Sequence, residues 1–357
     1  MKLTSKYISG FTLIEILVAL TIGSIILAGV VQVFLGSKQA ESLTMSLARI
    51  QENGRFAMEA LNKDLRLTGY QGCADPQLEF IPPSNIQANN FGVSDISNQP
   101  IAGAAVPSGG GTVSLFGGAV SVTDAVGDTD IVSIIYASPK SEQLSSNMAT
   151  ASADITIGAN NAGFAPTDVL LISNCSSDGQ YVFQATTVSG SGPVTITHSA
   201  AGNSSNSFGS LLFETGTSLH ELIHNTYYIK VNPRGIRALY RRSLTGNTVE
   251  LIEGVENFKV LYGHYEDNNT TVITDDDIRW VDAATINSTA SLDWRNVSSV
   301  KAALLMTDDL EVLSSVGPAS YSLLGTSVAP INSDRKLRRV FSTSAKIRNR
   351  DGKRISQ

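Results

Sequence analysis

The sequence predicts an α+β fold, in which one long N-terminal helix packs on a large antiparallel β-rich C-terminal domain. Three observations lead to this prediction. Residues 11–35 of the 357-residue chain form an apolar run with Glu15 as the only charge, and no proline precedes Pro76. After Leu67 the composition changes to Ser, Thr, Gly and Asn, and short apolar runs alternate with turn residues. We therefore expect a helix first and strands throughout residues 68–357.

The apolar run is long enough to cross a membrane. At a rise of about 1.5 Å per residue, residues 11–35 give a helix roughly 38 Å long, and a bilayer core is about 30 Å thick. Lys2 and Lys6 precede the run without an acidic residue, so the N-terminus is expected in the cytoplasm and everything after Leu35 in the periplasm. A secretory signal is cleaved after its apolar stretch, whereas here the small residue Gly10 lies before it.

Past Gly36 the expected helix becomes amphipathic. Apolar residues and one glycine recur at steps of three and four, which places them on one helical face: Leu43, Leu47, Ile50, Gly54, Met58, Leu61 and Leu65. Charged residues occupy the other faces: Lys38, Glu41, Arg49, Glu52, Arg55, Glu59 and Lys63. The pattern predicts one continuous helix over residues 11–67, whose second half places one face on a globular domain.

The β-rich domain follows without a convincing internal repeat. Alternating or continuous apolar runs predict strands over 131–136, 169–172, 181–188, 194–197, 226–231, 236–240, 255–262, 300–306 and 340–347. Residues 82–127 are rich in Gly, Ser and Asn, and we expect mainly loops there. The expected organisation is a leader over 1–10, a helix over 11–67 and a single domain over 68–357.

The leader ends in a specific motif. Its residues run Gly10-Phe11-Thr12-Leu13-Ile14-Glu15, with lysines before the glycine. This resembles the type III signal of type IV prepilins and type II secretion pseudopilins. The resemblance implies a pilin-like fold, cleavage between Gly10 and Phe11 by a membrane aspartyl peptidase, and N-methylation of Phe11.

Later segments are similar to PilW-type minor pilins. They are residues 55–57, 69–73, 255–263, 338–341 and 348–350. The resemblance implies a structural minor pilin that helps to initiate and assemble type IV pili in a tip or priming complex, and so supports twitching motility, adhesion or DNA uptake. Its implied partners are the prepilin peptidase, other major and minor pilins through their N-terminal helices, and a PilY-type tip adhesin. A J-type pseudopilin of a type II secretion system, with the same leader and a similar head, is the alternative.

Glu15 is the candidate assembly residue. A carboxylate inside a membrane helix costs about 2.5 to 3.5 kcal/mol on insertion scales, so it needs a partner. Cleavage after Gly10 creates one, the ammonium of Phe11. Four residues of helix span about 6 Å, so a neighbouring subunit displaced outward by one turn brings its Phe11 amine level with this Glu15. The carboxylate can also be satisfied within one chain, because helix N-termini favour negative charge.

Two cysteines, Cys73 and Cys175, lie far apart in the sequence, so they form no CxxC redox pair or cysteine-rich zinc site. In an oxidising compartment one disulfide between them is expected, and it stabilises the fold by up to about 4 to 5 kcal/mol in the chain-entropy model. Two buried free thiols are the alternative.

Residues 220–224 read His-Glu-Leu-Ile-His, the H-E-x-x-H pattern of zinc proteases. The pattern needs a helix, but the β-branched and aromatic residues Thr226, Tyr227 and Tyr228 follow directly. We therefore expect a hairpin strand with exposed histidines and no metal; a membrane-tethered zinc protease is the less favoured alternative.

Two further charged regions raise the question of a bound ligand: calcium in the first and nucleic acid in the second. The acidic residues of 267–277 lack the glycine and terminal glutamate of an EF-hand, so a solvated loop is expected and calcium binding stays open. The basic stretch Arg335–Arg354 includes a predicted terminal strand, where alternating charges fit a solvated face or a subunit contact better than nucleic acid. The net charge of −6 gives no nucleic-acid signature either. No Ser/His/Asp order, phosphate-binding glycine loop or dinucleotide fingerprint is present, so we expect no enzyme activity and no cofactor.

Overall fold

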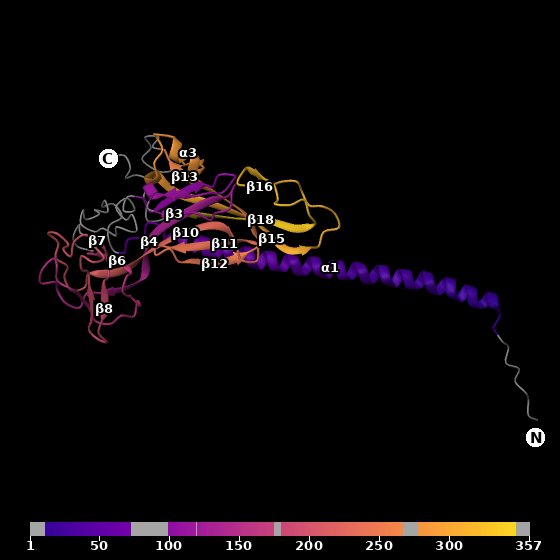
Figure 1. Ribbon diagram of the computed structural model, residues 1–357, viewed down its shortest axis with the longest axis horizontal. Helices are drawn as coiled ribbons and strands as arrows, with labels where there is room; N and C mark the ends of the chain where they lie inside the picture. The colour runs from indigo at the N-terminus through magenta and orange to yellow at the C-terminus, as the bar shows by residue number, and fades with distance from the viewer. Residues whose placement is uncertain (1–10, 73–98, 119, 175–179, 267–277, 348–357) are drawn as a thin grey trace, which may run out of the picture.

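The computed structural model of the chain describes residues 11–72, 99–118, 120–174, 180–266 and 278–347. A helix of 55 residues, α1 (Leu13–Leu67), extends from a β-rich domain. Its C-terminal half lies on this domain, whereas its N-terminal half projects away from it (Figure 1). The predicted fold class, one long N-terminal helix packed on a large antiparallel β-rich domain, is therefore confirmed.

Two antiparallel sheets form the body of the domain. The larger has the order β1-β4-β10-β11-β12, with β6 added on β10 and β7 on β6. Its strands are β1 (Ile101–Ala105), β4 (Asp130–Gln143), β6 (Val169–Ser173), β7 (Gln180–Gln184), β10 (Ser218–Val231), β11 (Arg237–Ser243) and β12 (Thr248–Glu253). The second sheet has the order β14-β13-β15-β18, formed by β14 (Ile278–Val281), β13 (Val255–Tyr265), β15 (Val297–Glu311) and β18 (Lys336–Lys346).

Smaller elements decorate these sheets. A three-stranded sheet at the end of the molecule far from the N-terminus contains β5 (Ile155–Ile157), β9 (Val194–Thr197) and β8 (Thr187–Ser189). Two hairpins pair β2 (Val113–Leu115) with β3 (Val120–Val122) and β16 (Tyr321–Leu323) with β17 (Thr326–Val328). The short helical turns are η1 (Phe116–Gly118), α3 (Ala283–Ser288) and η3 (Trp294–Asn296).

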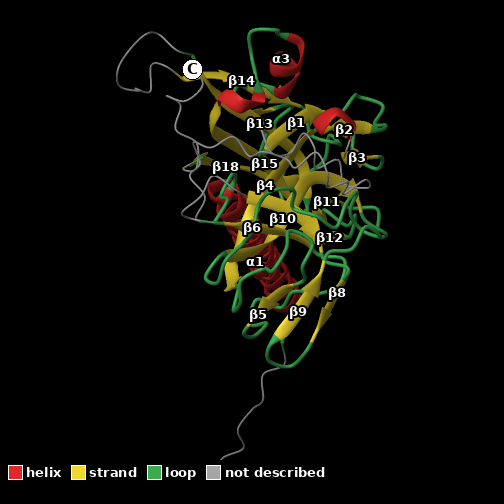
Figure 2. Ribbon diagram, turned by 90° about the vertical axis from the view of Figure 1, so that its left-hand side faces the viewer, coloured by secondary structure: helices red, strands yellow, loops and turns green. Residues whose placement is uncertain are grey.

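The two halves of α1 differ in burial, as their sequences predict. Every described residue from Phe11 to Glu41 is exposed, and the first buried residue is Ser46. Figure 2 shows the helix running beneath the strands, and its main partners are β18 and β15. At Gly54 an added Cβ would lie 2.6 Å from the ring of Phe341 on β18. The absence of a side chain at this position therefore lets the helix approach the sheet closely.

The predicted apolar face of α1 is largely confirmed. Ile50, Gly54, Leu61 and Leu65 are buried, and they pack with residues of both sheets in the main hydrophobic core. Leu43 is exposed, contrary to the prediction, because it precedes the first point of contact with the domain. The charged residues predicted on the other faces are all exposed.

The nine predicted strand segments all fall largely in observed strands, with two kinds of difference. Predicted segment 181–188 is divided between β7 and β8. The described part of 82–127, expected to be mainly loops, contains β1, β2 and β3. β1 has small residues because Gly103 lies against the buried Tyr262: an added Cβ would meet its hydroxyl oxygen. A strand selected for close packing lacks the alternation that sequence analysis detects.

Candidate functional site

The first turn of α1 holds the predicted assembly residue. Thr12 is the N-cap, and Glu15 and Thr12 form a capping box. The backbone N–H of Thr12 donates to Glu15 Oε2 at 2.9 Å, and the Thr12 hydroxyl donates to the same oxygen at 3.0 Å. In a single subunit the carboxylate is thus satisfied within its own chain, the alternative that sequence analysis left open.

The part of α1 around Glu15 is exposed on all sides in the described structure. Phe11 is 86% exposed, and no described residue covers the helix from there to Glu41. α1 is long and apolar enough to cross a membrane, and its most apolar window has no contact with the β-rich domain. Gly10, the predicted cleavage residue, lies outside the described residues. This end of the molecule presents an apolar rod with one carboxylate in its first turn.

The other end of α1 is held by a buried carboxylate that sequence analysis missed. Asp64 is 5% exposed and accepts three hydrogen bonds. Tyr136 donates its hydroxyl to Oδ1 at 3.0 Å, while Tyr227 and Asn225 donate to Oδ2 at 2.6 Å each. Burial and the Asp64 charge raise the pKa of Tyr136 and Tyr227 well above the usual range. Both tyrosines therefore stay protonated and act as donors.

A signal for Asp64 exists in the sequence. Ile50, Gly54, Ala57, Leu61 and Asp64 follow each other at steps of three and four, so Asp64 falls on the buried face. A carboxylate on an apolar face needs donors from the surface on which the helix packs. The strands β4 and β10 supply these donors, and they connect the end of α1 to the centre of the larger sheet.

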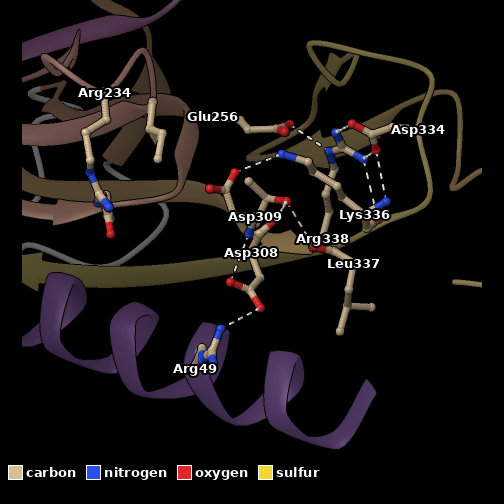
Figure 3. A network of polar contacts seen from close by, with 12 residues as sticks. Arg49, Arg234, Glu256, Asp308, Asp309, Asp334, Lys336, Leu337 and Arg338 are labelled. Carbon is tan, nitrogen blue, oxygen red and sulfur yellow. Dashed lines mark hydrogen bonds and ion pairs between the residues drawn. The ribbon is translucent and has the colours of Figure 1, made fainter. Parts of the chain in front are cut away.

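A second polar network joins the middle of α1 to the second sheet (Figure 3). Arg49 lies 3.7 Å from Asp308 of β15, and the neighbouring Asp309 pairs with Lys336 of β18 at 3.1 Å. Arg338 of β18 is almost fully buried and donates to Glu256 of β13 at 2.8 Å. Its two terminal nitrogens donate to Asp334 at 2.6 and 3.0 Å, which holds the pKa of the Asp334 carboxyl below its usual value.

This network corrects one expectation. The basic residues of the C-terminal strand were expected on a solvated face or at a subunit contact. Only Arg338 departs from it, because it is internal, whereas Arg339 and Lys346 of the same strand are exposed as expected. Arg335 and Lys336 pair with Glu311 and Asp309 at 3.1 Å each. A buried cation on β18 is stable here because it is paired with carboxylates from β13 and from the segment that precedes β18. Arg348, Arg350, Lys353 and Arg354 lie outside the described residues.

The H-E-x-x-H segment lies in β10, so the predicted strand is confirmed, but its histidines are not exposed as expected. His220 and His224 are 4% and 3% exposed. His220 Nδ1 lies 2.8 Å from the Ser138 carbonyl oxygen, and His224 Nε2 lies 2.6 Å from the Ser133 hydroxyl. Residues four apart in a strand are about 13 Å apart, so the two imidazoles are poorly placed to share one zinc ion.

No group of three metal-ligating side chains comes together in the described part of the chain. Cys73 and Cys175, the predicted disulfide, lie outside it, and so does the acidic loop 267–277. Their predicted roles stay predictions.

Comparisons with known proteins give two family matches. Residues 226–349 match the family described as Type IV Pilus-assembly protein W, and residues 5–31 match the prokaryotic N-terminal methylation motif. No curated protein matches significantly. A solved type IV-like pilin from Thermus thermophilus aligns over 51% of this chain and 84% of its own, at 16% identity and a TM-score of 0.21. So low a TM-score adds nothing to the family matches.

The matches give the class of protein. This chain carries the N-terminal methylation motif of prepilins, at the start of a helix apolar enough to span a membrane. Within that class its C-terminal part carries a PilW domain, which begins inside β10 and extends through β18. The predicted resemblance to PilW-type minor pilins is therefore confirmed. Proteins of this kind have structural roles in type IV pili.

Replacing Asp64 by alanine should lower the free energy of unfolding by at least about 2 kcal/mol, because each buried donor left without an acceptor costs about 1 to 3 kcal/mol. Urea unfolding of the full chain in detergent micelles, followed by near-UV circular dichroism, measures this. Glu59→Ala, an exposed carboxylate on the same helix, is the matched control and should change the free energy by less than about 0.5 kcal/mol. Equal effects of the two variants would show that Asp64 does not hold the helix.

Stability should also fall in mild acid. Burial, assisted by the charge of Arg242, lowers the pKa of His224 to about 3, whereas an unfolded histidine titrates near 6.5. Between these values the unfolded chain binds one more proton at this position, so the His224 contribution falls by about 1.4 kcal/mol per pH unit, or about 2 kcal/mol on going from pH 7 to pH 5. Urea unfolding at both pH values should show a smaller loss for His224→Gln than for the unmodified chain. Equal losses would contradict the burial of a neutral imidazole.

Proposed function

We propose that this protein is a minor pilin that takes part in initiating and assembling type IV pili, in a tip or priming complex with other minor pilins. The observation that carries the proposal is the bare first half of α1, continuous with a second half fixed on the head. The PilW family match and the prepilin motif support the pilus assignment. Twitching motility, adhesion or DNA uptake would be consequences of pilus formation.

The proposed topology follows from the charges around α1. Residues 1–10 form a cytoplasmic leader, residues 11–35 cross the inner membrane once, and the head lies in the periplasm until assembly moves it to the cell-surface pilus. The positive residues Lys2 and Lys6 precede the span. Prepilin peptidase then cuts after Gly10 and methylates Phe11. Other major and minor pilins are the proposed partners of the bare helix, and a PilY-type adhesin is a proposed partner at the tip.

Glu15 has two states in this proposal. Before cleavage its carboxylate caps its own helix through Thr12. Cleavage creates the Phe11 ammonium, and a neighbouring subunit displaced by one turn brings that cation to this carboxylate. In the low dielectric of a membrane or a helix bundle, a hydrogen bond between an ammonium and a carboxylate, both charged, is stronger than the cap, in which only the acceptor is charged. The exchange directs each subunit into register.

Replacing Glu15 by alanine should leave cleavage intact but reduce surface filaments at least about tenfold. Hydrogen bonds to charged groups contribute about 1.5 to 3 kcal/mol, and about 1.4 kcal/mol corresponds to a tenfold change in an equilibrium. Filaments sheared from the cell surface are quantified against total pilin in the membrane fraction. Glu41→Ala, an exposed carboxylate on the same helix, is the control and should assemble normally. Normal piliation by the Glu15→Ala strain would exclude the pairing mechanism.

Replacing Gly10 by alanine should block processing, because the peptidase of this family cuts after a glycine. Intact-mass measurement of the membrane-extracted variant should find residues 1–10 still attached, with no mature filament subunit. Normal cleavage of this variant would show that the processing site lies elsewhere, and it would leave the Glu15 experiment interpretable because the latter reports assembly.

A further inference from the structure

Along part of one edge, strand β10 of the larger sheet has no described strand beside it. On one edge it pairs with β4 along most of its length. On the other edge it pairs with β6 from Ser218 to Glu221 and with β11 from Asn225 to Val231. No described strand pairs with Leu222, Ile223 and His224 on this second edge. The gap is three residues, or about 10 Å of extended chain.

A cavity of about 350 Å³ opens at this gap. Glu221 and Asp168, which lie beside the start of β6, line one side of it, and Arg241 of β11 lines the other. Ile223 lies between them on β10. We call this cavity the β10 notch and define it by these four residues.

The two ends of the β10 notch carry opposite charges. Among the described residues, neither the Glu221 carboxylate nor the Arg241 guanidinium forms a hydrogen bond or an ion pair. Asp168 accepts one hydrogen bond, from the backbone N–H of Ala165 at 2.8 Å. Burial and the charge of Asp168 raise the pKa of Glu221, and the charge of Lys140 offsets part of this rise. A cation at this end would relieve the repulsion between the two carboxylates, and an anion at the other end would pair with Arg241.

The wall of the β10 notch is rigid. Arg241 lies opposite Tyr227 in the register of β10 and β11, so both side chains point to the face that carries α1. Tyr136 and Asn225 also line the cavity, and both donate to the buried Asp64. A ligand that enters the notch therefore meets side chains already fixed by the end of α1, which limits the entropy lost on binding.

We propose that the β10 notch binds an extended peptide segment of a partner protein, with an acidic residue near its N-terminal end and a basic residue near its C-terminal end. The open edge of β10 offers backbone groups for strand addition. Because β6 and β11 both run antiparallel to β10, a segment between them runs in the same direction. It then enters at the Arg241 side and leaves at the Glu221 side, which fixes the order of its charges. This binding does not depend on the proposed pilus function.

The probe that tests the proposal is the blocked peptide acetyl-Glu-Thr-Val-Thr-Lys-amide with a fluorescent label, titrated against the full chain in detergent micelles. The matched control is acetyl-Lys-Thr-Val-Thr-Glu-amide, which has the same composition and net charge in reversed order. We expect the first peptide to bind at least about tenfold more tightly, which corresponds to about 1.4 kcal/mol. Equal binding of the two peptides, or no binding of either, overturns the proposal.

Variants locate the site. Glu221→Gln and Arg241→Gln should each weaken binding of the first peptide at least about tenfold, while Arg242→Gln, the neighbouring position on β11, should leave it unchanged. The double variant Glu221→Arg with Arg241→Glu should prefer the reversed peptide, which a general loss of structure could not produce. Near-UV circular dichroism shows that each variant is folded. A preference that persists in the double variant overturns the assignment of the notch.

Discussion

The three hydrogen bonds that Asp64 accepts are the constraint on which the rest of this molecule depends. They fix the C-terminal turn of α1 on the larger sheet, and Gly54 lets the middle of the helix approach β18. A helix held at these places continues straight out of the domain. Its first half then has no partner among the described residues of its own chain. Such an apolar surface is stable only in a bilayer or against other apolar helices. Holding one half therefore leaves the other half available for assembly.

In the proposed assembly, Glu15 sets the displacement of one helix along the next. A purely apolar helix could shift along a neighbouring apolar helix, because the packing contacts between the two change little from one turn to the next. A single carboxylate near one end removes this freedom, since only one displacement brings it to a cation. In the free subunit Thr12 satisfies that carboxylate, so the membrane-embedded form does not carry an unpaired charge. The cap and the proposed intersubunit pair use the same carboxylate, so one replaces the other in the proposed assembly.

Sequence patterns predict the parts of this structure in which one physical requirement dominates. The long helix and its two halves follow from hydropathy and from the three- and four-residue spacing of Ile50, Gly54, Leu61 and Leu65. The long central strands follow from β-branched and aromatic runs. β1 could not be found in this way, because Gly103 is selected to fit beneath Tyr262 and carries no side chain that would reveal a strand.

The sequence did not reveal the burial of several polar residues for a related reason. Asp64, His224 and Arg338 are polar in sequence and therefore appear exposed, but their partners come from distant segments such as Tyr136, Ser133 and Glu256. The helical spacing can place Asp64 on the buried face of α1, but the identity of the partners of all three residues has no local signature in the sequence. The β10 notch is similar, because it arises where two strands stop on one edge of a third, and only the sheet topology shows it. The prepilin motif could be read directly, because it is a short run of residues that are consecutive in the sequence.

The most direct test of the central claim is the intact mass of the unmodified protein purified from cell membranes. If the bare half of α1 is a stem for polymerisation that proteolysis makes competent, the chain begins at Phe11 and carries one methyl group on its amine. A chain that retains Met1, or one that begins beyond Leu35, would contradict the account, because Glu15 would then have no new cation or would itself have been removed.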